Sequence, residues 1–105
     1  MFVVGKTDIG KQRSENQDRF RLNMLDDYTC VAVVCDGMGG AASGNVASRL
    51  ACEIYQETLE SSLKGVDLYS ITREEMVKIL RLSVVCANKA VYAKSQTDNK
   101  CYGMG

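Results

Sequence analysis

Asp36 is the residue of this sequence best placed to do chemistry. It ends an apolar run and precedes a glycine turn in the segment Val33–Ala41, which reads VVCDGMGGA. A carboxylate in that position is exposed at the edge of a sheet, beside backbone that no side chain shields. Carboxylate and carbonyl oxygens are the ligands of hard divalent cations. The segment therefore indicates a metal site or a ligand that closely approaches the backbone.

Two other interpretations of this glycine-rich segment compete with a metal site. Gly37, Gly39 and Ala42 match the G-x-G-x-x-A pattern of dinucleotide-binding turns. Against that interpretation, the Asp36 carboxylate would repel a pyrophosphate, and the required next strand ending in an acidic residue is missing. The second alternative is structural: Asp36 caps a tight turn or a helix start, as Asp does in many Asp-Gly pairs.

Composition limits the chemistry that this chain can perform. It has no histidine, which excludes a serine-histidine-acid triad built from its own residues. Thirteen basic and thirteen acidic residues cancel, so no net field favours nucleic acid or an anionic membrane. Five cysteines without a CxxC pair indicate a reduced, cytoplasmic chain rather than a disulfide scaffold or a zinc site.

Length and hydropathy indicate one globular domain. The chain has 105 residues, of which 46% are apolar. No segment approaches the apolar length of a membrane span, and the first ten residues show no signal-peptide pattern. We therefore expect neither a membrane nor a nucleic acid as a partner.

Strands that could position Asp36 are predicted from the hydrophobic pattern. Phe2–Val4 is a short apolar start, which we expect to be a first strand. Arg19–Asn23 alternates between apolar and polar residues, and Tyr28–Cys35 is a continuous valine-rich run. Such a continuous run is typical of a strand covered on both faces. Polar loops are expected at residues 7–18 and 37–44.

Two helices are expected after the strands. The first runs from about Asn45 to Leu63, and the second begins with a capping box from Thr72 to Glu75. We expect Ile71 to pack on Met76 as a hydrophobic staple. The first apolar stripe comprises Ala47, Leu50, Ala51, Ile54, Leu59 and Leu63, and the second comprises Met76, Ile79, Leu80, Val84, Ala87 and Val91.

A second motif precedes the alternating strand, and together the motifs resemble a known family. Thr7–Asp18 reads T-D-x-G-x-x-R-x-x-N-Q-D, and Val34–Gly40 reads V-C-D-G-M-G-G. Gly44–Ser48 then reads G-x-x-A-S, and the chain closes on Gly103-Met104-Gly105. Over essentially its whole length the sequence resembles the N-terminal part of the PPM family, the metal-dependent type 2C protein serine/threonine phosphatases, in their bacterial form.

The resemblance implies an α+β fold and a set of site residues. Residues 1–105 would form the N-terminal portion of a PPM domain, a partial α-β-β-α sandwich of strands and two long helices. The resemblance implies two Mn²⁺ or Mg²⁺ ions in the intact family. Asp36 corresponds to the carboxylate that bridges both metals, the Gly37 carbonyl to a ligand of one, and Asp18 to an acid that reaches them directly or through water. Asp36 and Asp18 are therefore the expected catalytic residues, and Arg13 corresponds to the side chain that binds the substrate phosphate.

Other polar residues are assigned lesser roles. Asp8 is expected to cap a turn, and Glu15 and Gln17 to lie on the loop surface. The helix carboxylates, Glu53 and Glu60 among them, are expected to face solvent. At position 41 many bacterial members of the family have a histidine, where this chain has alanine.

The number of carboxylates sets an expectation for activity. The family's later motifs, which supply at least two more metal-binding aspartates, do not occur in these 105 residues. Two dications about 4 Å apart repel by roughly 16 kcal/mol at an effective dielectric constant of about 20. Asp18 and Asp36 bring only two negative charges against that repulsion. We expect this chain alone to hold at most one weakly bound ion and to be an inactive fragment.

The function implied by the resemblance is metal-dependent hydrolysis of phosphomonoesters on proteins. Its partners would be phosphoserine and phosphothreonine proteins, together with a serine/threonine kinase that shares those substrates, in the cytoplasm. The alternative is a noncatalytic interaction or anion-binding module derived from the same fold. Apolar helix surface without a full packing partner also predicts self-association.

Overall fold

The computed structural model describes residues 1–11, 13, 15–40 and 42–105, and these residues form an α+β fold. The elements are β1 (Asp18–Met24), β2 (Cys30–Asp36), α1 (Ser43–Leu63), α2 (Arg73–Thr97) and a short 3-10 helix, η1 (Asn99–Cys101). The expected loops at 7–18 and 37–44 include residues 12, 14 and 41, which lie outside the described residues. The architecture agrees with the expected partial sandwich of strands and two long helices.

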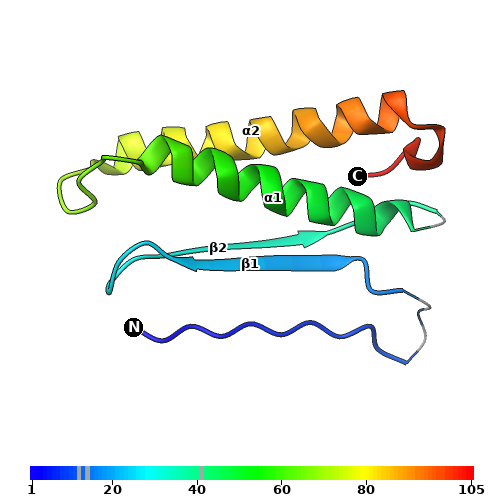
Figure 1. The fold of residues 1–105 in the computed structure, drawn as a ribbon, viewed down its shortest axis with the longest axis horizontal. Coiled ribbons are helices and arrows are strands. Elements are labelled where there is room, and N and C mark those ends of the chain that lie inside the picture. Colours follow the sequence, from blue (N-terminus) through cyan, green and yellow to red (C-terminus); the bar gives the residue numbers. More distant parts are fainter. Residues whose placement is uncertain (12, 14, 41) are drawn as a thin grey trace.

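The elements stack in three layers to give a flat molecule (Figure 1). β1 and β2 pair antiparallel, α1 packs on both strands, and α2 packs on α1. The extents are 45 × 31 × 17 Å and the radius of gyration is 15.4 Å. A compact chain of this length would have a radius of about 13 Å. The long helices explain the difference, because a 25-residue helix alone is about 37 Å long.

Only one face of the two-stranded sheet is covered by helices, so the expectation that the run ending at Cys35 is covered on both faces was wrong. Val33 and Cys35 point towards α1 and are half-buried, whereas Val34 points away and is 78% exposed. Ala32 is exposed as well. The continuous apolar run reflects a strand whose second face is left largely uncovered by the residues that the structure describes.

The first apolar segment is not a strand, contrary to expectation. Residues 1–9 have no regular secondary structure and run beside β1 in the opposite direction (Figure 1). Phe2 is 90% exposed, and the segment touches the sheet at Gly5, which lies against the ring of Phe20. Three apolar residues in a row do not specify a strand when their side chains find no surface to cover.

Both helices begin close to the residues expected from the sequence, but their buried faces agree less well with the expected apolar stripes. α1 begins at Ser43, two residues before the expected Asn45. The predicted capping box of α2 is confirmed: the Glu75 N–H donates to Thr72 Oγ1 (3.1 Å), and the Thr72 N–H donates to Glu75 Oε2 (3.1 Å). The packing of Ile71 on Met76 stays a prediction.

The buried face of α2 is shorter than the expected stripe. Ala87 and Val91 are buried, but Leu80 is 37% exposed and Val84 is 57% exposed. Within the described residues α2 packs on α1 and η1, and its backbone does not come close to either strand. The middle of α2 therefore faces a surface that no element of these residues covers.

Polar contacts join β1 to α1 and correct the expectation for the helix carboxylates. Arg21 and Glu53 form an ion pair (3.6 Å), and the Asn23 amide donates a hydrogen bond to the Glu60 carboxylate. These helix carboxylates were expected to face solvent. They instead bond the helix-facing polar side chains of β1, which explains how a strand with Arg and Asn on its inner face packs on a helix.

Neither long helix, in the part of the chain that the structure describes, could cross a membrane.

The C-terminal residues are part of the core. Cys101 and Met104 are buried with Ala47 of α1 and Val91 of α2. Beyond them, Gly105 and Met38 exchange both backbone hydrogen bonds, with the Met38 N–H donating to Gly105 O (2.6 Å) and the Gly105 N–H donating to Met38 O (3.0 Å). This packing holds the end of the described chain beside the glycine loop that follows β2.

Candidate metal and phosphate site

Asp18 and Asp36 face each other across the antiparallel ladder. Asp18 is the first residue of β1, Asp36 is the last residue of β2, and the two are register partners. The next pair outward is hydrogen-bonded, since the Gly37 N–H donates to Gln17 O (3.1 Å). Antiparallel pairs alternate, so Asp18 and Asp36 form a non-hydrogen-bonded pair, the type in which side chains lie closer together. The fold thus places two exposed carboxylates side by side.

This carboxylate pair is electrostatically unfavourable by itself. Like charges directly opposite on one face of a sheet destabilise the pairing. A cation between them would remove that repulsion. The pair is therefore compatible with a cation site, whereas turn capping would need only one of the two aspartates.

Gly37 is required by close packing as well as by its position. A Cβ atom at Gly37 would overlap the carbonyl oxygen of Gly44, in the first turn of α1. Only glycine allows the backbone after Asp36 to pass this close to the helix. The close approach fixes the Gly37 peptide next to the Asp36 carboxylate. The carbonyl of Gly37 remains the expected third oxygen ligand.

Gln17 is a site residue that the sequence interpretation missed. Its carbonyl accepts from Gly37, and its side-chain amide donates to Gly39 O (3.2 Å). A Cβ atom on Gly44 would lie 2.6 Å from the Gln17 Cδ. Gln17 thus occupies the space that Gly44 leaves open and bonds the glycine loop from the side of β1. The signal was present as a glycine in the first helical turn, which indicates that another group approaches the backbone there.

Glu15 also forms a hydrogen bond with α1. Its Oε1 accepts a hydrogen bond from Asn45 Nδ2 (2.9 Å). Glu15 and Gln17 were expected to lie on the loop surface, but both are half-buried and bond to α1 or to the loop before it. Their contacts hold the segment before Asp18 against the segment after Asp36.

A polar hollow of about 180 Å³ collects most of the expected site residues. Asp18, Asp36 and Arg13 all line it. Arg13 is exposed, so its guanidinium is accessible to an anion. The described residues that line the hollow are Asp8, Ile9, Arg13, Glu15, Asn16, Gln17, Asp18 and Asp36.

The loop around Arg13 is organised by short-range hydrogen bonds. Asp8 accepts from the Gly10 N–H (2.8 Å), which is the turn-capping role expected for it. Asn16 Oδ1 accepts from the Asp18 N–H (3.1 Å), and Asn16 Nδ2 donates to Thr7 Oγ1 (2.8 Å). Asn16 therefore connects the start of β1 to the preceding loop.

The oxygen atoms available as metal ligands are of the type that a hard divalent ion prefers, but they are too few to enclose one. Asp18 and Asp36 offer carboxylate oxygens and Gly37 a carbonyl oxygen, which are typical ligands of Mg²⁺ and Mn²⁺. Within residues 1–11, 13, 15–40 and 42–105, no three histidine, cysteine, aspartate or glutamate side chains come together as a metal site. These residues fit part of the ligand shell of one ion, and they do not fit a closed two-metal centre.

Cysteines behind Asp36 do not add a metal ligand. The pKa of the Cys52 thiol is raised from 9.0 to about 12, chiefly by burial and then by a side-chain hydrogen bond and the Coulombic interaction with Cys35. Arg21 and Arg19 oppose this shift. The pKa of the Tyr55 hydroxyl is raised as well, mainly by burial. Cys52 is therefore a protonated thiol at neutral pH.

Comparison with known proteins agrees with the family resemblance of the sequence motifs. The family described as protein phosphatase 2C matches residues 4–101. The serine/threonine phosphatase stp of Listeria monocytogenes is 28% identical over 105 residues, which is all of this chain and 40% of that protein. The corresponding phosphatase of Listeria innocua is 27% identical over the same coverage.

A shorter match reaches higher identity. A Streptococcus pyogenes protein whose name assigns it to protein phosphatase 2C is 47% identical over 52 residues, covering 48% of this chain and 20% of that protein. The chain thus spans about 40% of the length of the listerial phosphatases it matches in full.

Proposed function

Because the chain belongs to the protein phosphatase 2C family, we propose that residues 1–105 form the N-terminal portion of a metal-dependent phosphatase domain and contribute part of its active site. The substrates are phosphoserine and phosphothreonine proteins, and a serine/threonine kinase acts on the same proteins. The proteins named serine/threonine phosphatase among the relatives support this substrate class.

The single observation that carries the proposal is the position of Arg13 in the hollow that the Asp18–Asp36 pair closes. A phosphomonoester needs a cationic group that can bind its oxygens in a fixed orientation, and arginine does this bidentately. Carboxylates beside that arginine would repel the phosphate unless a cation lies between them. The two groups are compatible with one substrate only when a metal ion is bound.

We assign the roles accordingly. Asp36, Asp18 and the Gly37 carbonyl hold Mn²⁺ or Mg²⁺, with Gln17 and Glu15 as positioning residues for this set. A divalent ion bound there supplies activated water for attack on the phosphorus. Arg13 binds the phosphate oxygens and orients the phosphate group in the hollow. Asp18 and Asp36 are catalytic through this ligand role.

The chain alone is expected to lack activity. Two carboxylates and one carbonyl leave most of the ligand shell of a metal pair to other residues. We also place the protein in the cytoplasm, which is supported by five cysteines that are all free thiols.

An anion-binding module without catalysis is the alternative, and the hollow disfavours it. Asp8, Glu15, Asp18 and Asp36 surround a single described cation, Arg13, so the field in the hollow is negative. A metal-free site of this composition repels phosphate. Anion binding therefore depends on prior metal binding.

Paramagnetic broadening by Mn²⁺ tests the metal role directly. In amide spectra of the 105-residue chain, substoichiometric Mn²⁺ should broaden the signals of Asp18, Asp36 and Gly37 first. Asp36→Asn should abolish this selectivity, whereas the control Glu57→Gln, on an exposed position of α1, should retain it. Equal broadening in Asp36→Asn would remove Asp36 from the metal site.

A further inference from the structure

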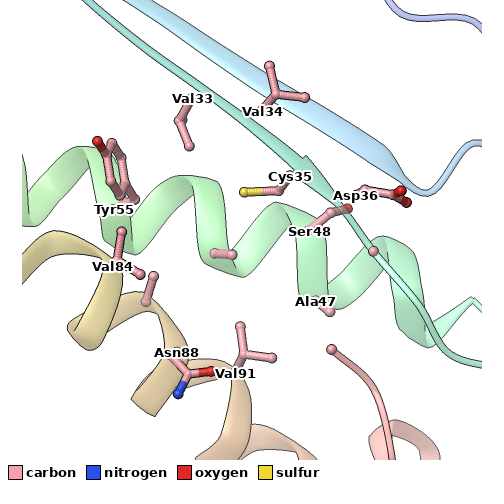
Figure 2. Close-up of a pocket in the computed structure, with 14 residues that line it drawn as sticks. Val33, Val34, Cys35, Asp36, Ala47, Ser48, Tyr55, Val84, Asn88 and Val91 are labelled. Atoms are coloured by element: carbon pink, nitrogen blue, oxygen red, sulfur yellow. The ribbon is translucent and has the colours of Figure 1, made fainter. Parts of the chain in front are cut away.

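Two cysteine side chains meet where β2 packs on α1. Cys35 is the next-to-last residue of β2, and its side chain points towards α1 (Figure 2). Cys52 lies on α1 and is 1% exposed. The two side chains share a hydrogen bond, and both are free thiols. The packing of β2 on α1 thus brings together two groups that oxidation can link covalently.

Cys35 is the thiol of this pair that a dissolved oxidant can reach. It is half-buried and lines an apolar groove of about 360 Å³ between β2 and α2. A water molecule takes up about 30 Å³ in the liquid, so this groove is wide enough for a molecule as small as hydrogen peroxide. An accessible cysteine beside a second cysteine is the usual arrangement in redox-sensing proteins.

Cys30 provides a comparison within the same strand. It is also half-buried and lies at the other end of β2, but five residues separate it from Cys35. Successive side chains of a strand point to opposite faces, so an odd separation places Cys30 on the face turned away from α1. Its thiol donates to the carbonyl oxygen of Val31 (3.5 Å). The fold therefore offers Cys35, and not Cys30, to Cys52.

We propose that Cys35 and Cys52 form a peroxide-sensitive pair, which closes to a reversible disulfide between β2 and α1. Hydrogen peroxide first transfers one oxygen atom to the Cys35 sulfur, which gives a sulfenic acid and one water. The Cys52 sulfur then attacks the Cys35 sulfur, the sulfur–oxygen bond breaks, and the hydroxyl group leaves with the Cys52 proton as a second water. The two thiols together lose two electrons and two protons, and one peroxide becomes two waters.

The disulfide is reversed by a dithiol reductant, which is oxidised to its own disulfide as both cysteines regain their protons. Disulfides of cytoplasmic proteins are usually transient and redox-sensing, so a reversible bond is compatible with a chain whose cysteines are otherwise free. The bond would fix the end of β2 to α1. This inference uses neither the metal nor the phosphate and does not depend on those roles.

Oxidation of the folded 105-residue chain by a small molar excess of hydrogen peroxide tests the proposal. The chain should lose two of its five free thiols and the mass of two hydrogen atoms. A tryptic digest should contain the peptide of Cys52 linked to the peptide that carries both Cys30 and Cys35. Fragmentation of this linked peptide in the mass spectrometer should assign the bond to Cys35 in the unsubstituted chain. Dithiothreitol should restore both thiols.

Two matched variants show whether the fold selects the pair. Cys30→Ser and Cys35→Ser each leave one cysteine on β2 and the same number of thiols in the chain. In buffer, the link to Cys52 should form at the parent rate in Cys30→Ser and at least tenfold more slowly in Cys35→Ser. In concentrated urea the two variants should form the link at similar rates, because the unfolded chain no longer holds Cys35 against Cys52.

Three outcomes would overturn the proposal. A bond from Cys30 to Cys52 as abundant as the bond from Cys35 in the folded parent chain would mean that the fold does not select the pair. Oxidation of Cys35 to a sulfinic or sulfonic acid without a link would mean that Cys52 does not reach it. Disulfide-linked dimers in place of the internal bond would assign the reaction to contacts between chains.

Discussion

Asp18 and Asp36 are direct partners across the β1–β2 ladder, at the end of the sheet where the Arg13 loop and the glycine loop meet. They are 18 residues apart in sequence, the difference between 36 and 18, and antiparallel pairing brings them together. Their closeness gives the chain an unfavourable charge pair that a cation can neutralise. This relationship leads to the first prediction.

Asp36→Asn should slightly stabilise the metal-free chain. The substitution removes a like-charge contact with Asp18, and such cross-strand pairs change stability by about 0.2–1 kcal/mol. With millimolar Mn²⁺ the order should reverse, because binding to the folded state stabilises only the parent chain. Urea titrations with and without Mn²⁺ measure both effects. If Asp36→Asn gains as much stability from Mn²⁺ as the parent does, the cation interpretation of the pair is wrong.

Arg13→Ala should remove phosphate binding while leaving Mn²⁺ binding nearly unchanged, because a guanidinium is no metal ligand. In the presence of saturating Mg²⁺, we expect the apparent affinity for inorganic phosphate to fall at least tenfold, about 1.4 kcal/mol. Titration of the amide spectrum with phosphate measures it, with Arg73→Ala, at the start of α2, as the control. An equal loss in both variants would indicate a general charge effect.

The 105-residue chain should show no measurable phosphatase activity, even in millimolar Mn²⁺. Two carboxylates cannot offset the repulsion of two dications, and the described residues offer no third acidic ligand at this site. Phosphate release from a phosphothreonine peptide is the measurement. Metal-dependent turnover by a monodisperse sample, lost in Asp36→Asn, would show that these residues form a complete catalytic site.

Gly37→Ala should destabilise the fold by about 2–4 kcal/mol, in the range of severe overpacking, because its new Cβ would overlap the backbone carbonyl of Gly44. Gly40→Ala is the matched control, since nothing lies within 4 Å of the Cβ position there. Gly44→Ala should be intermediate, because Gln17 can move away at the loss of its bond to Gly39. Chemical denaturation of the three variants gives the ranking. A Gly37→Ala chain as stable as Gly40→Ala would contradict the close approach of loop and helix.

Stability should fall as the pH rises above 9. The pKa of Cys52 is raised from 9.0 to about 12 in the folded chain, so between these values the unfolded chain has lost a proton that the folded chain retains. Deprotonation then favours unfolding, by about 1.4 kcal/mol at pH 10. The raised pKa of Tyr55 acts in the same direction at higher pH. Cys52→Ala should flatten the dependence between pH 8 and 10, and an unchanged slope in that variant would assign it to other groups.

Several features of the fold could be predicted from the sequence because they depend on neighbouring residues. The capping box from Thr72 to Glu75 needs only a hydroxyl and a carboxylate three residues apart, and it forms as expected. The strands β1 and β2 and both long helices follow from local hydrophobic patterns. Asp36 at a strand end before a glycine turn was likewise visible without tertiary information.

Other features could not be predicted, because they depend on what covers a surface. Phe2–Val4 has the composition of a strand, but it lies beside β1 without pairing. The apolar run that ends at Cys35 resembled a doubly covered strand, yet Val34 is 78% exposed because no helix of the described residues covers its side. A hydrophobic pattern predicts which side chains favour burial. It does not predict whether another part of the described chain lies over them.

The sequence by itself determined which residues are candidates for binding a metal and a phosphate, because the motifs that contain Arg13, Asp18, Asp36 and Gly37 resemble those of the family. Only the tertiary structure decided that Asp18 lies opposite Asp36, that Arg13 lines the same hollow, and that Gln17 and Gly44 fit together. The physical reason is that strand register and the approach of a loop to a helix are set by packing between distant segments. No local pattern in either segment contains that information.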